Sequence, residues 1–463
     1  MRYLVLYLLS FVTITVTAQT VRVIDFAGFI DHVTNNSPAA QRIYNTARAG
    51  EYQVEQARGL YDPQVAGSTN NKYFSEQQYY SYLKADVKQP IFTNQYIKAG
   101  YEFGKGAYID PEMKTPTMGL PYLGFEVGLL QGMMIDKRRA EVLKAQAYRD
   151  ALKARSRADL NNVLFRASTD YAEWLFSRKQ NQLYTFFYQL ADFRTSSIRH
   201  LTESGERAAI DTVEAEIYLQ SRQLERQGAL LDFTRKLADI RTYNWNSPND
   251  PADTTAQLQP TDSLESLFLM AKKNTMVLMG ADVNQHPMLA EYRAKQRVLE
   301  TEARFRREMI KPQLDVGYNF LYNEKANSYL STNNYKWQAT LAFPLFLRTP
   351  RNAYKLAKLE VENNGYDYLM KQAELLYKHT YLNQSTKLLL EQIVLATQAA
   401  DYSKRLLEAE RMKFGNGESS VFMINSRESK WLETELKLCE LKLKFVINYF
   451  QYVYLTGDNR YVR

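Results

Sequence analysis

The sequence predicts a mainly α-helical protein with transmembrane β-strands, in which long antiparallel helical hairpins occur in two internal structural repeats. Three observations predict this fold class. Prolines at positions 38 and 63 recur at 287 and 312, an offset of 249 residues in both cases. Segments that alternate apolar and polar side chains follow each proline pair. A helical stretch roughly 95 Å long then follows each of these segments, since a helix rises about 1.5 Å per residue.

The N-terminus is typical of a secretory signal peptide. Arg2 supplies a positive start, residues 3–16 form an uncharged apolar run, and Val16-Thr17-Ala18 supplies small residues before Gln19. A membrane anchor needs about 20 apolar residues, and this run is shorter. We therefore expect residues 1–18 to be cleaved and the mature chain to be exported.

Each repeat begins with a helix between its two prolines. Pro38 and Pro287 open these helices, because a proline at the first helical position sacrifices no hydrogen bond. Pro63-Gln64 and Pro312-Gln313 end them, because proline clashes with a continuing helix and extends the preceding residue. The predicted helices span residues 39–60 and 288–309.

Strand-like alternation follows both helices. In the second repeat it covers residues 318–322 and 335–343, and the Asn-rich residues 323–334 between them predict a loop. Side chains at every second position share one face of a strand. The second repeat therefore predicts two strands joined by a loop.

The first repeat is longer in its strand region. Leu83, Ala85 and Val87 alternate with charged residues, and a second candidate strand spans residues 122–130. Residues 93–121, rich in Gly, Tyr and Pro, have no counterpart in the second repeat. They are compatible with an extra strand or with a surface loop.

Long helical hairpins make up the rest of each repeat. Gly205 and Gly417 lie in turns that end the long helices, because glycine readily reaches the left-handed conformation. The long helices are predicted over residues 136–200 and 352–414, and the return helices over 209–243 and 420–455. Such hairpins cannot bury their apolar sides alone, and so few strands leave unpaired edges. We therefore expect several copies to close these surfaces in a ring.

Coiled-coil spacing supports this packing. Apolar residues from Leu432 to Phe450 step alternately by four and three, which produces a seam for neighbouring helices. Cys439 lies on this seam, so a packing role is expected. It is the single cysteine of the sequence, so no internal disulfide can form.

Nine segments follow from these patterns. They are a signal peptide (1–18), N-terminal helices of repeat 1 (19–62), strands and loops of repeat 1 (63–131), the helical hairpin of repeat 1 (132–243), a linker segment (244–283), the helix of repeat 2 (284–311), strands of repeat 2 (312–347), the helical hairpin of repeat 2 (348–456), and a C-terminal tail (457–463).

Charge and motifs argue against several function classes. The net charge of +8 is dispersed among acidic residues, so no nucleic-acid partner is expected. The four histidines, His32, His200, His286 and His379, are scattered without ligand spacing. The sequence carries neither a phosphate loop nor a nucleophile elbow. We expect no enzyme activity, no cofactor and no metal site.

The order and spacing of these features resemble the TolC-type outer-membrane factor family, the outer-membrane efflux proteins. The resemblance covers nearly the whole mature chain. It is carried by the two Pro–helix–Pro-Gln units, the strand exit Phe343-Pro344-Leu345-Phe346, the first turn with Ala209 to Glu216, and the second turn from Gly417 to Phe422 with Asn425 to Glu428.

The resemblance implies a homotrimeric exit duct in the outer membrane of a Gram-negative-type bacterium. Each copy would give four strands to a shared twelve-stranded β-barrel in outer-membrane lipid, and the long helices would form an α-barrel in the periplasm. The duct would serve a tripartite efflux or type I secretion system as a passive conduit. It would open when a periplasmic adaptor (membrane-fusion) protein of an inner-membrane pump docks at the helix tips.

Ten residues are candidates for these roles. Those for the adaptor-docking turns are Gly205, Glu206, Gly417 and Glu418. Those for a periplasmic gate are Asp211, Glu214 and Arg427. Those for membrane-facing aromatics are Tyr335, Trp337 and Phe343, whose aromatic rings suit a membrane interface.

A second interpretation stays open. A periplasmic coiled-coil adaptor or scaffold protein of an export complex would also carry a signal peptide and long helical hairpins. It would place its β-rich part in water, whereas a channel would place its strands in lipid. Membrane fractionation distinguishes the two.

Overall fold

The computed structural model of the chain describes residues 21–92, 94–247, 249–251, 257–280, 282–322 and 333–457. The predicted signal peptide (1–18), most of the predicted loop (323–334) and all of the tail after residue 457 lie outside these ranges. The chain divides into two units. Unit 1 comprises residues 1–41, 161–281 and 379–463, and unit 2 comprises residues 42–160 and 282–378.

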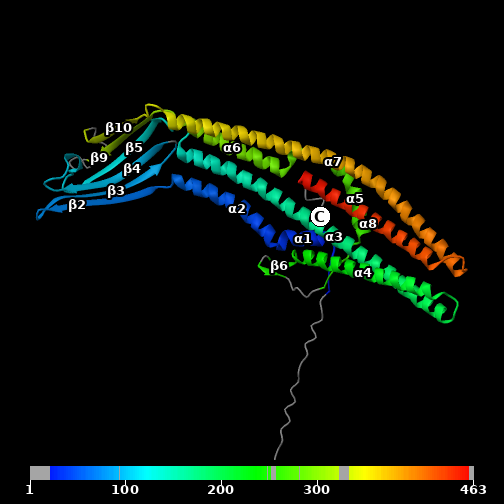
Figure 1. Cartoon of the computed structure of the whole chain (residues 1–463). Helices are drawn as coiled ribbons and strands as arrows, with labels where there is room; N and C mark the ends of the chain where they lie inside the picture. Colours follow the sequence, from blue (N-terminus) through cyan, green and yellow to red (C-terminus); the bar gives the residue numbers. More distant parts are fainter. Residues whose placement is uncertain are drawn as a thin grey trace, which may run out of the picture. The chain divides into compact units, whose positions relative to one another are not determined.

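Unit 2 contains an antiparallel sheet in the order β10-β9-β5-β4-β3-β2. Figure 1 shows these strands gathered side by side. Four strands come from the first repeat and two from the second. Their bounds are β2 Gln64–Phe74, β3 Gln77–Pro90, β4 Gln95–Lys105, β5 Leu120–Leu130, β9 Gln313–Leu321 and β10 Tyr335–Ala342.

The sheet corrects the strand number that the family resemblance implied. Its described residues form six strands, not four. The open segment 93–121 contains β4, which alternates apolar residues with Lys98, Gly100 and Glu102. Strand β2 gave little sequence signal, because small and polar residues fill most of its length. An inserted hairpin, β3–β4, therefore separates β2 from β5.

Four helices, each with at least part of its length in unit 2, connect to this sheet. The helix α2 (Pro38–Arg58) precedes β2 and α3 (Lys137–Glu203) follows β5, while α6 (Pro287–Glu308) precedes β9 and α7 (Arg348–Gly415) follows β10. The prolines at 63 and 312 lie between helix and strand, as predicted. His286 caps α6, because its Nδ1 accepts the amide of Met288 at 3.2 Å.

Contacts place these helices in the same order as their strands. Gly50 of α2 allows close approach to α3, because an added Cβ would lie 3.0 Å from the Cα of Arg149. On α3, Lys144 pairs with Glu302 of α6 at 2.8 Å. Asn364 of α7 donates to Gln296 of α6 at 2.8 Å. The order α2-α3-α6-α7 thus matches β2, β5, β9 and β10, and the hairpin β3–β4 adds no helix.

The two long helices are continuous, as predicted. α3 has 67 residues and α7 has 68, and α7 passes through Gly365 without a break. The return helices are α4 (Ala209–Arg241) and α8 (Val421–Thr456). No described helix is both long enough and apolar enough to span a membrane.

Unit 1 holds an aromatic core beside a small parallel sheet. Strand β1 (Val21–Ile24) pairs with β8 (Gln257–Pro260), and helices α1 (Phe26–Asn36) and α5 (Leu264–Leu278) follow them. The ring of Phe26 lies 5.4 Å from Tyr171 and 5.3 Å from Phe450. Cys439 is buried in α8, as its seam position predicted, and burial raises the pKa of its thiol to about 11.

Candidate functional site

The sheet of unit 2 exposes its apolar side chains and partly buries its charged ones. In β3, Leu83, Ala85 and Val87 are exposed, whereas Lys84 and the other charged residues between them are half-buried. A soluble protein's sheet shows the opposite, with apolar residues packed on the core. This inverted alternation is the feature that a lipid-facing sheet requires.

The strand register carries the apolar face across the sheet. Leu83 lies opposite Phe103, Ile97 opposite Phe125, Phe125 opposite Tyr318, and Tyr318 opposite Trp337. Aromatic rings contact one another along it, with 6.0 Å between the centroids of Phe125 and Tyr318. The face is therefore continuous from β3 to β10.

The predicted membrane-facing aromatics lie on or next to this face. Tyr335 is 50% exposed and Trp337 is 64% exposed on β10, and Tyr335 stacks on Tyr318 with 5.6 Å between ring centroids. Phe343 follows the last residue of β10 and is 48% exposed. All three aromatic side chains are thus accessible in the single chain.

The opposite face of the sheet carries ion pairs that sequence reasoning missed. Glu126 of β5 pairs with Lys98 of β4 and, at 3.6 Å, with Lys88 of β3. Lys84 pairs with Glu102 across β3 and β4 at 3.7 Å. The charged residues alternating with Leu83, Ala85 and Val87 were the available signal, but their partners on other strands could not be read from spacing.

The two glycine turns have the geometry predicted for helix ends. Gly205 has φ +81° and Gly417 has φ +78°, in the left-handed region. The amide of Glu206 donates to Leu201 at 2.8 Å, and that of Glu418 donates to Lys413 at 2.9 Å. An added Cβ at either glycine would meet no atom within 4 Å. Both turns are therefore open to a partner.

The helix tips of the two hairpins pack together, and Figure 1 shows the α3–α4 and α7–α8 turns next to each other. Ile198 of α3, Ala215 of α4 and Val421 of α8 form a buried cluster, and Phe414 of α7 packs against it. The Arg207 guanidinium lies 4.7 Å from the centroid of the Phe414 ring. All four helices thus contribute to the tip.

A buried carboxylate joins the two hairpins farther from the turns than this cluster. Glu428 of α8 is 0% exposed. Its carboxylate accepts hydrogen bonds from both terminal nitrogens of Arg194 of α3, each at 2.7 Å. Arg411 of α7 donates to the same carboxylate at 3.3 Å. The Tyr218 hydroxyl of α4 also donates to it, at 3.4 Å. Burial raises the pKa of the Tyr218 hydroxyl. A bidentate guanidinium–carboxylate pair at this depth fixes the helices that carry it.

The predicted gate residues lie near the tip but do not contact one another. Asp211 pairs with Arg207, which lies in the turn before α4, at 3.9 Å. Arg427 lies 3.6 Å from the carboxylate of Glu410. Glu214 makes no ion pair among the described residues. The sequence placed Glu428 within a segment that resembles the family, but Glu428 was not among the predicted gate residues.

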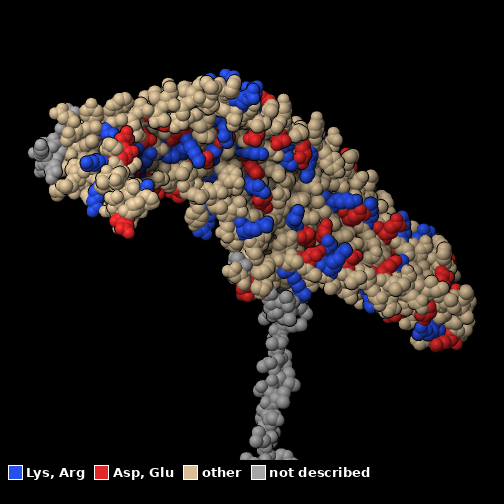
Figure 2. All heavy atoms as spheres, turned by 60° about the vertical axis from the view of Figure 1, so that its left-hand side comes forward, with Lys and Arg blue, Asp and Glu red and all other residues tan. Residues whose placement is uncertain are grey.

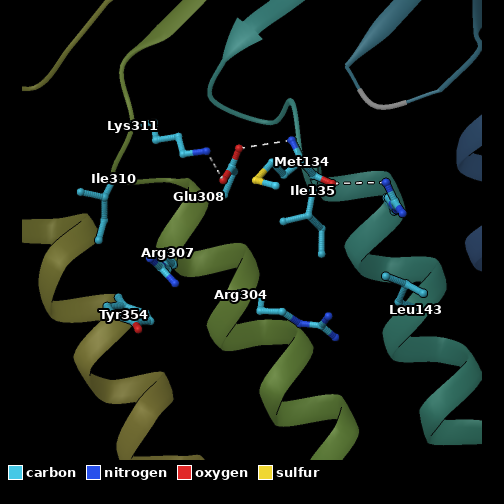
Figure 3. Close-up of a pocket in the computed structure, with 10 residues that line it drawn as sticks. Met134, Ile135, Leu143, Arg304, Arg307, Glu308, Ile310, Lys311 and Tyr354 are labelled. Atoms are coloured by element: carbon cyan, nitrogen blue, oxygen red, sulfur yellow. Dashed lines mark hydrogen bonds and ion pairs between the residues drawn. The ribbon is translucent and has the colours of Figure 1, made fainter.

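A cavity of about 690 Å³ lies in unit 2 between the starts of α3 and α7 and the end of α6. Figure 3 shows side chains that line it, among them apolar Ile135 and Leu143 and basic Arg304 and Arg307. Buried Glu308 pairs with Lys311 at 2.7 Å and accepts the Met134 amide at 3.4 Å. These contacts fix the end of α6 to the turn that follows β5.

Metal-ligand geometry and surface charge describe these sites further. The part of the chain that the structure describes holds no cluster of three His, Cys, Asp or Glu residues with metal-site geometry. On the face that Figure 2 shows, basic and acidic side chains are interspersed, with no patch of one sign.

Comparison with solved structures shows the fold. The outer-membrane channel CmeC of Campylobacter jejuni superposes with a TM-score of 0.66 at 14% identity, over 93% of this chain and 85% of that one. VceC of Vibrio cholerae gives 0.66 at 13% identity, over 93% and 96%. MtrE of Neisseria gonorrhoeae, solved in its open state, gives 0.63 at 12% identity, over 93% and 88%.

Sequence comparison gives no relative. A scan against models of protein families finds no match, and a search of curated proteins finds none either. At identities of 11–14% with these solved structures, the comparison shows the fold alone.

Proposed function

We propose that this chain, which has the fold of the TolC-type outer-membrane channels, is itself an outer-membrane channel. The inverted alternation of the sheet carries the proposal, because an exposed apolar face is stable only against lipid or a partner. The likeness to CmeC, VceC and MtrE over 93% of the chain supports it. The channel would be the passive exit duct of a tripartite efflux or type I secretion system.

A homotrimer would close the open surfaces of the chain. Among the described residues the sheet ends in two unpaired edges, β2 and β10, and such edges are prohibited in a bilayer. In a shared barrel the apolar face would contact outer-membrane lipid and the charged face would line water. The helices would then extend into the periplasm, where the long hairpins of three copies would pack as a tunnel.

The helix tips would receive a periplasmic adaptor protein coupled to an inner-membrane pump. Open turns at Gly205 and Gly417, beside exposed Glu206 and Glu418, support this assignment. An apolar stripe on α4 also reaches the tip, where Ile210 is 68% exposed and Ile217 is 64% exposed. The stripe offers apolar contact and the acidic turns offer charge.

The gate would lie at the same tips. Asp211, Glu214 and Arg427 are its proposed residues, since each lies in the first turns of a return helix. The Arg194–Glu428–Arg411 network holds the two hairpins together just beyond them. Adaptor docking would have to shift the helices that this network joins.

Membrane fractionation tests the main proposal. We expect the mature protein in the outer membrane as a trimer that resists detergent and dissociates on heating. In planar lipid bilayers the purified trimer should conduct ions. A monomer released by osmotic shock would instead support the periplasmic adaptor or scaffold.

Substitution at the turns tests docking. Asn tolerates a positive φ and adds a side chain, so Gly205→Asn and Gly417→Asn preserve the turns while obstructing their surface. Gly228→Asn is the matched control, because Gly228 lies in α4 with equally open space around it. We expect the two turn variants to form stable trimers yet lose export of the cargo that cells lacking the chain accumulate. Full export by both turn variants would refute docking at the turns.

A further inference from the structure

We infer that the hairpin β3–β4 is part of the pore wall and that β2 and β10 of neighbouring copies pair, so that three copies close an eighteen-stranded barrel. This rests on the proposed function and specifies its pore. The hairpin occupies the middle of the sheet, where β3 pairs with β2 and β4 pairs with β5. It therefore widens the sheet by two strands and is not an appendage at its edge.

The hairpin carries the two faces of the wall. Ala85 of β3 and Ala99 of β4 lie on the exposed apolar side, where Ala99 lies opposite Leu123 of β5. Lys84 and Lys98 lie on the charged side, where they pair with Glu102 and Glu126. This alternation would not stabilise a loop surrounded by water. A strand between lipid and a water-filled lumen requires it, because its two faces contact different solvents.

Contacts at its turn fix the hairpin in the plane of the sheet. Asn94 accepts the Gly128 amide of β5 at 2.7 Å, and its own amide donates to the Asp136 carboxylate at 3.2 Å. Arg138 of α3 donates to the Phe92 carbonyl at 3.3 Å. The turn is thus anchored to the end of β5 and to the start of α3, and not to solvent.

The edges of the sheet have the geometry that closure needs. All residues of β2 and β10 are exposed in the single chain. The six strands alternate in direction, so the two edge strands run antiparallel to each other. Pairing β10 of one copy with β2 of the next therefore continues an antiparallel sheet without a break, and a second copy of this chain is the occupant of each edge.

The consequence is a wide pore. Barrel diameter grows roughly in proportion to strand number, so eighteen strands give a diameter about 1.5 times that of twelve. Barrels of 16–18 strands enclose an aqueous channel. The inserted hairpin would therefore set the size of cargo that passes the membrane.

Thiol labelling in liposomes tests the inference. Single cysteines replace Lys84, Ala85, Lys98 or Ala99 in a Cys439→Ala background, and a charged, membrane-impermeant maleimide is added. We expect Lys84→Cys and Lys98→Cys to be labelled and Ala85→Cys and Ala99→Cys to be protected by lipid. Gln338→Cys and Ala339→Cys are the matched control pair, because they lie on the two faces of β10, outside the hairpin.

Two outcomes separate the inference from the proposed function. If the control pair alternates but all four hairpin cysteines label alike, the channel stands and the hairpin lies outside the wall. If the purified protein neither forms a trimer nor conducts, the proposed function itself fails. Exclusion of neutral polymers from the conducting pore gives a second readout, and a cut-off diameter suited to twelve strands would overturn the inference.

Discussion

At the scale of single residues, Glu428 of α8 contacts residues of the other three helices at the tip. Removing the charge of one partner in a buried pair costs about 3–5 kcal/mol, because the other charge is left uncompensated. We therefore expect Glu428→Gln to lower the free energy of unfolding by about 3 kcal/mol, measured by chemical denaturation in detergent.

A double substitution is the control for that loss. Arg194→Met with Glu428→Leu removes both buried charges, and the remaining Arg411 side chain is 40% exposed and can turn to water. Replacing a buried ion pair by apolar residues is often neutral or stabilising. The double variant should therefore be more stable than Glu428→Gln. A double variant as unstable as the single one would contradict this account.

Asp170 gives a pH dependence whose sign can be worked out. Burial raises the pKa of this α3 carboxyl above its ordinary value of 3.8, although the Tyr243 hydroxyl donates to it at 2.7 Å. The folded state therefore holds the proton more tightly than the unfolded state. Stability is fully present below the ordinary pKa and is lost as pH rises through the raised one.

Asp170→Asn should remove this loss, because the amide keeps an acceptor for Tyr243 but carries no charge. We expect the melting temperature of the variant, relative to that of the wild type, to increase as pH rises from about 4 to 8. Circular dichroism melts across this range measure it. A difference that stays constant with pH would show that Asp170 does not titrate differently on folding.

Residue-level prediction from sequence succeeded where the signal was local. Gly205 and Gly417 were predicted from turn composition, and both adopt a positive φ. The pair of Arg194 and Glu428 spans 234 residues of sequence. No helical or strand periodicity links residues so far apart, so this contact required the structure.

At the scale of elements, the glycines of β4 and β5 make room for large neighbours on the charged face. A Cβ at Gly100 would lie 2.6 Å from the hydroxyl of Tyr122. At Gly67 of β2, the nearest atom outside its chain neighbours is the Lys84 carbonyl oxygen at 4.0 Å. The same substitution should therefore act differently at the two positions.

Gly100→Val should sharply reduce the yield of folded, heat-modifiable protein on refolding, since Tyr122 would have to move. Gly67→Val should leave that yield unchanged or raise it, because valine favours strands and meets no close atom. Electrophoresis of heated and unheated samples measures the yield. Equal yields for both variants would argue against close packing on the charged face.

Most helical elements followed from the sequence, except α5 (Leu264–Leu278), which lies in the predicted linker segment, whereas several strands did not. Proline-opened helices, continuous long helices and glycine turns have strong local causes. Small or polar residues fill positions 66–72 of the strand β2, and β4 is interrupted by glycines. Their strand form depends on pairing with β3 and β5, which are separate segments of the chain.

At the scale of the whole molecule, the two faces of the sheet predict opposite responses to charge. An Arg on the lipid side near the bilayer midplane costs about 2–4 kcal/mol. Ala339 lies on the apolar face and Gln338, its neighbour, on the charged face. We expect Ala339→Arg to reduce the amount of trimer in outer membranes and Gln338→Arg to leave it nearly normal.

Immunoblots of separated membranes, with the periplasmic fraction as reference, measure this pair. The comparison is internally matched, since the two positions are adjacent on one strand and receive the same side chain. Tolerance of Arg at both positions would show that neither face contacts hydrocarbon.

Hairpin insertion has a consequence for how such walls can change over evolutionary time. A hairpin adds two strands of opposite direction, so the direction of β5 does not change and its end still leads into α3. The helix α3 therefore keeps its neighbours α2 and α6. In the proposed trimer the circumference can thus grow by two strands per copy, or six per ring, while the helices that follow the strands keep their order. The width of the pore and the helix tips that would receive an adaptor could then be selected independently of each other.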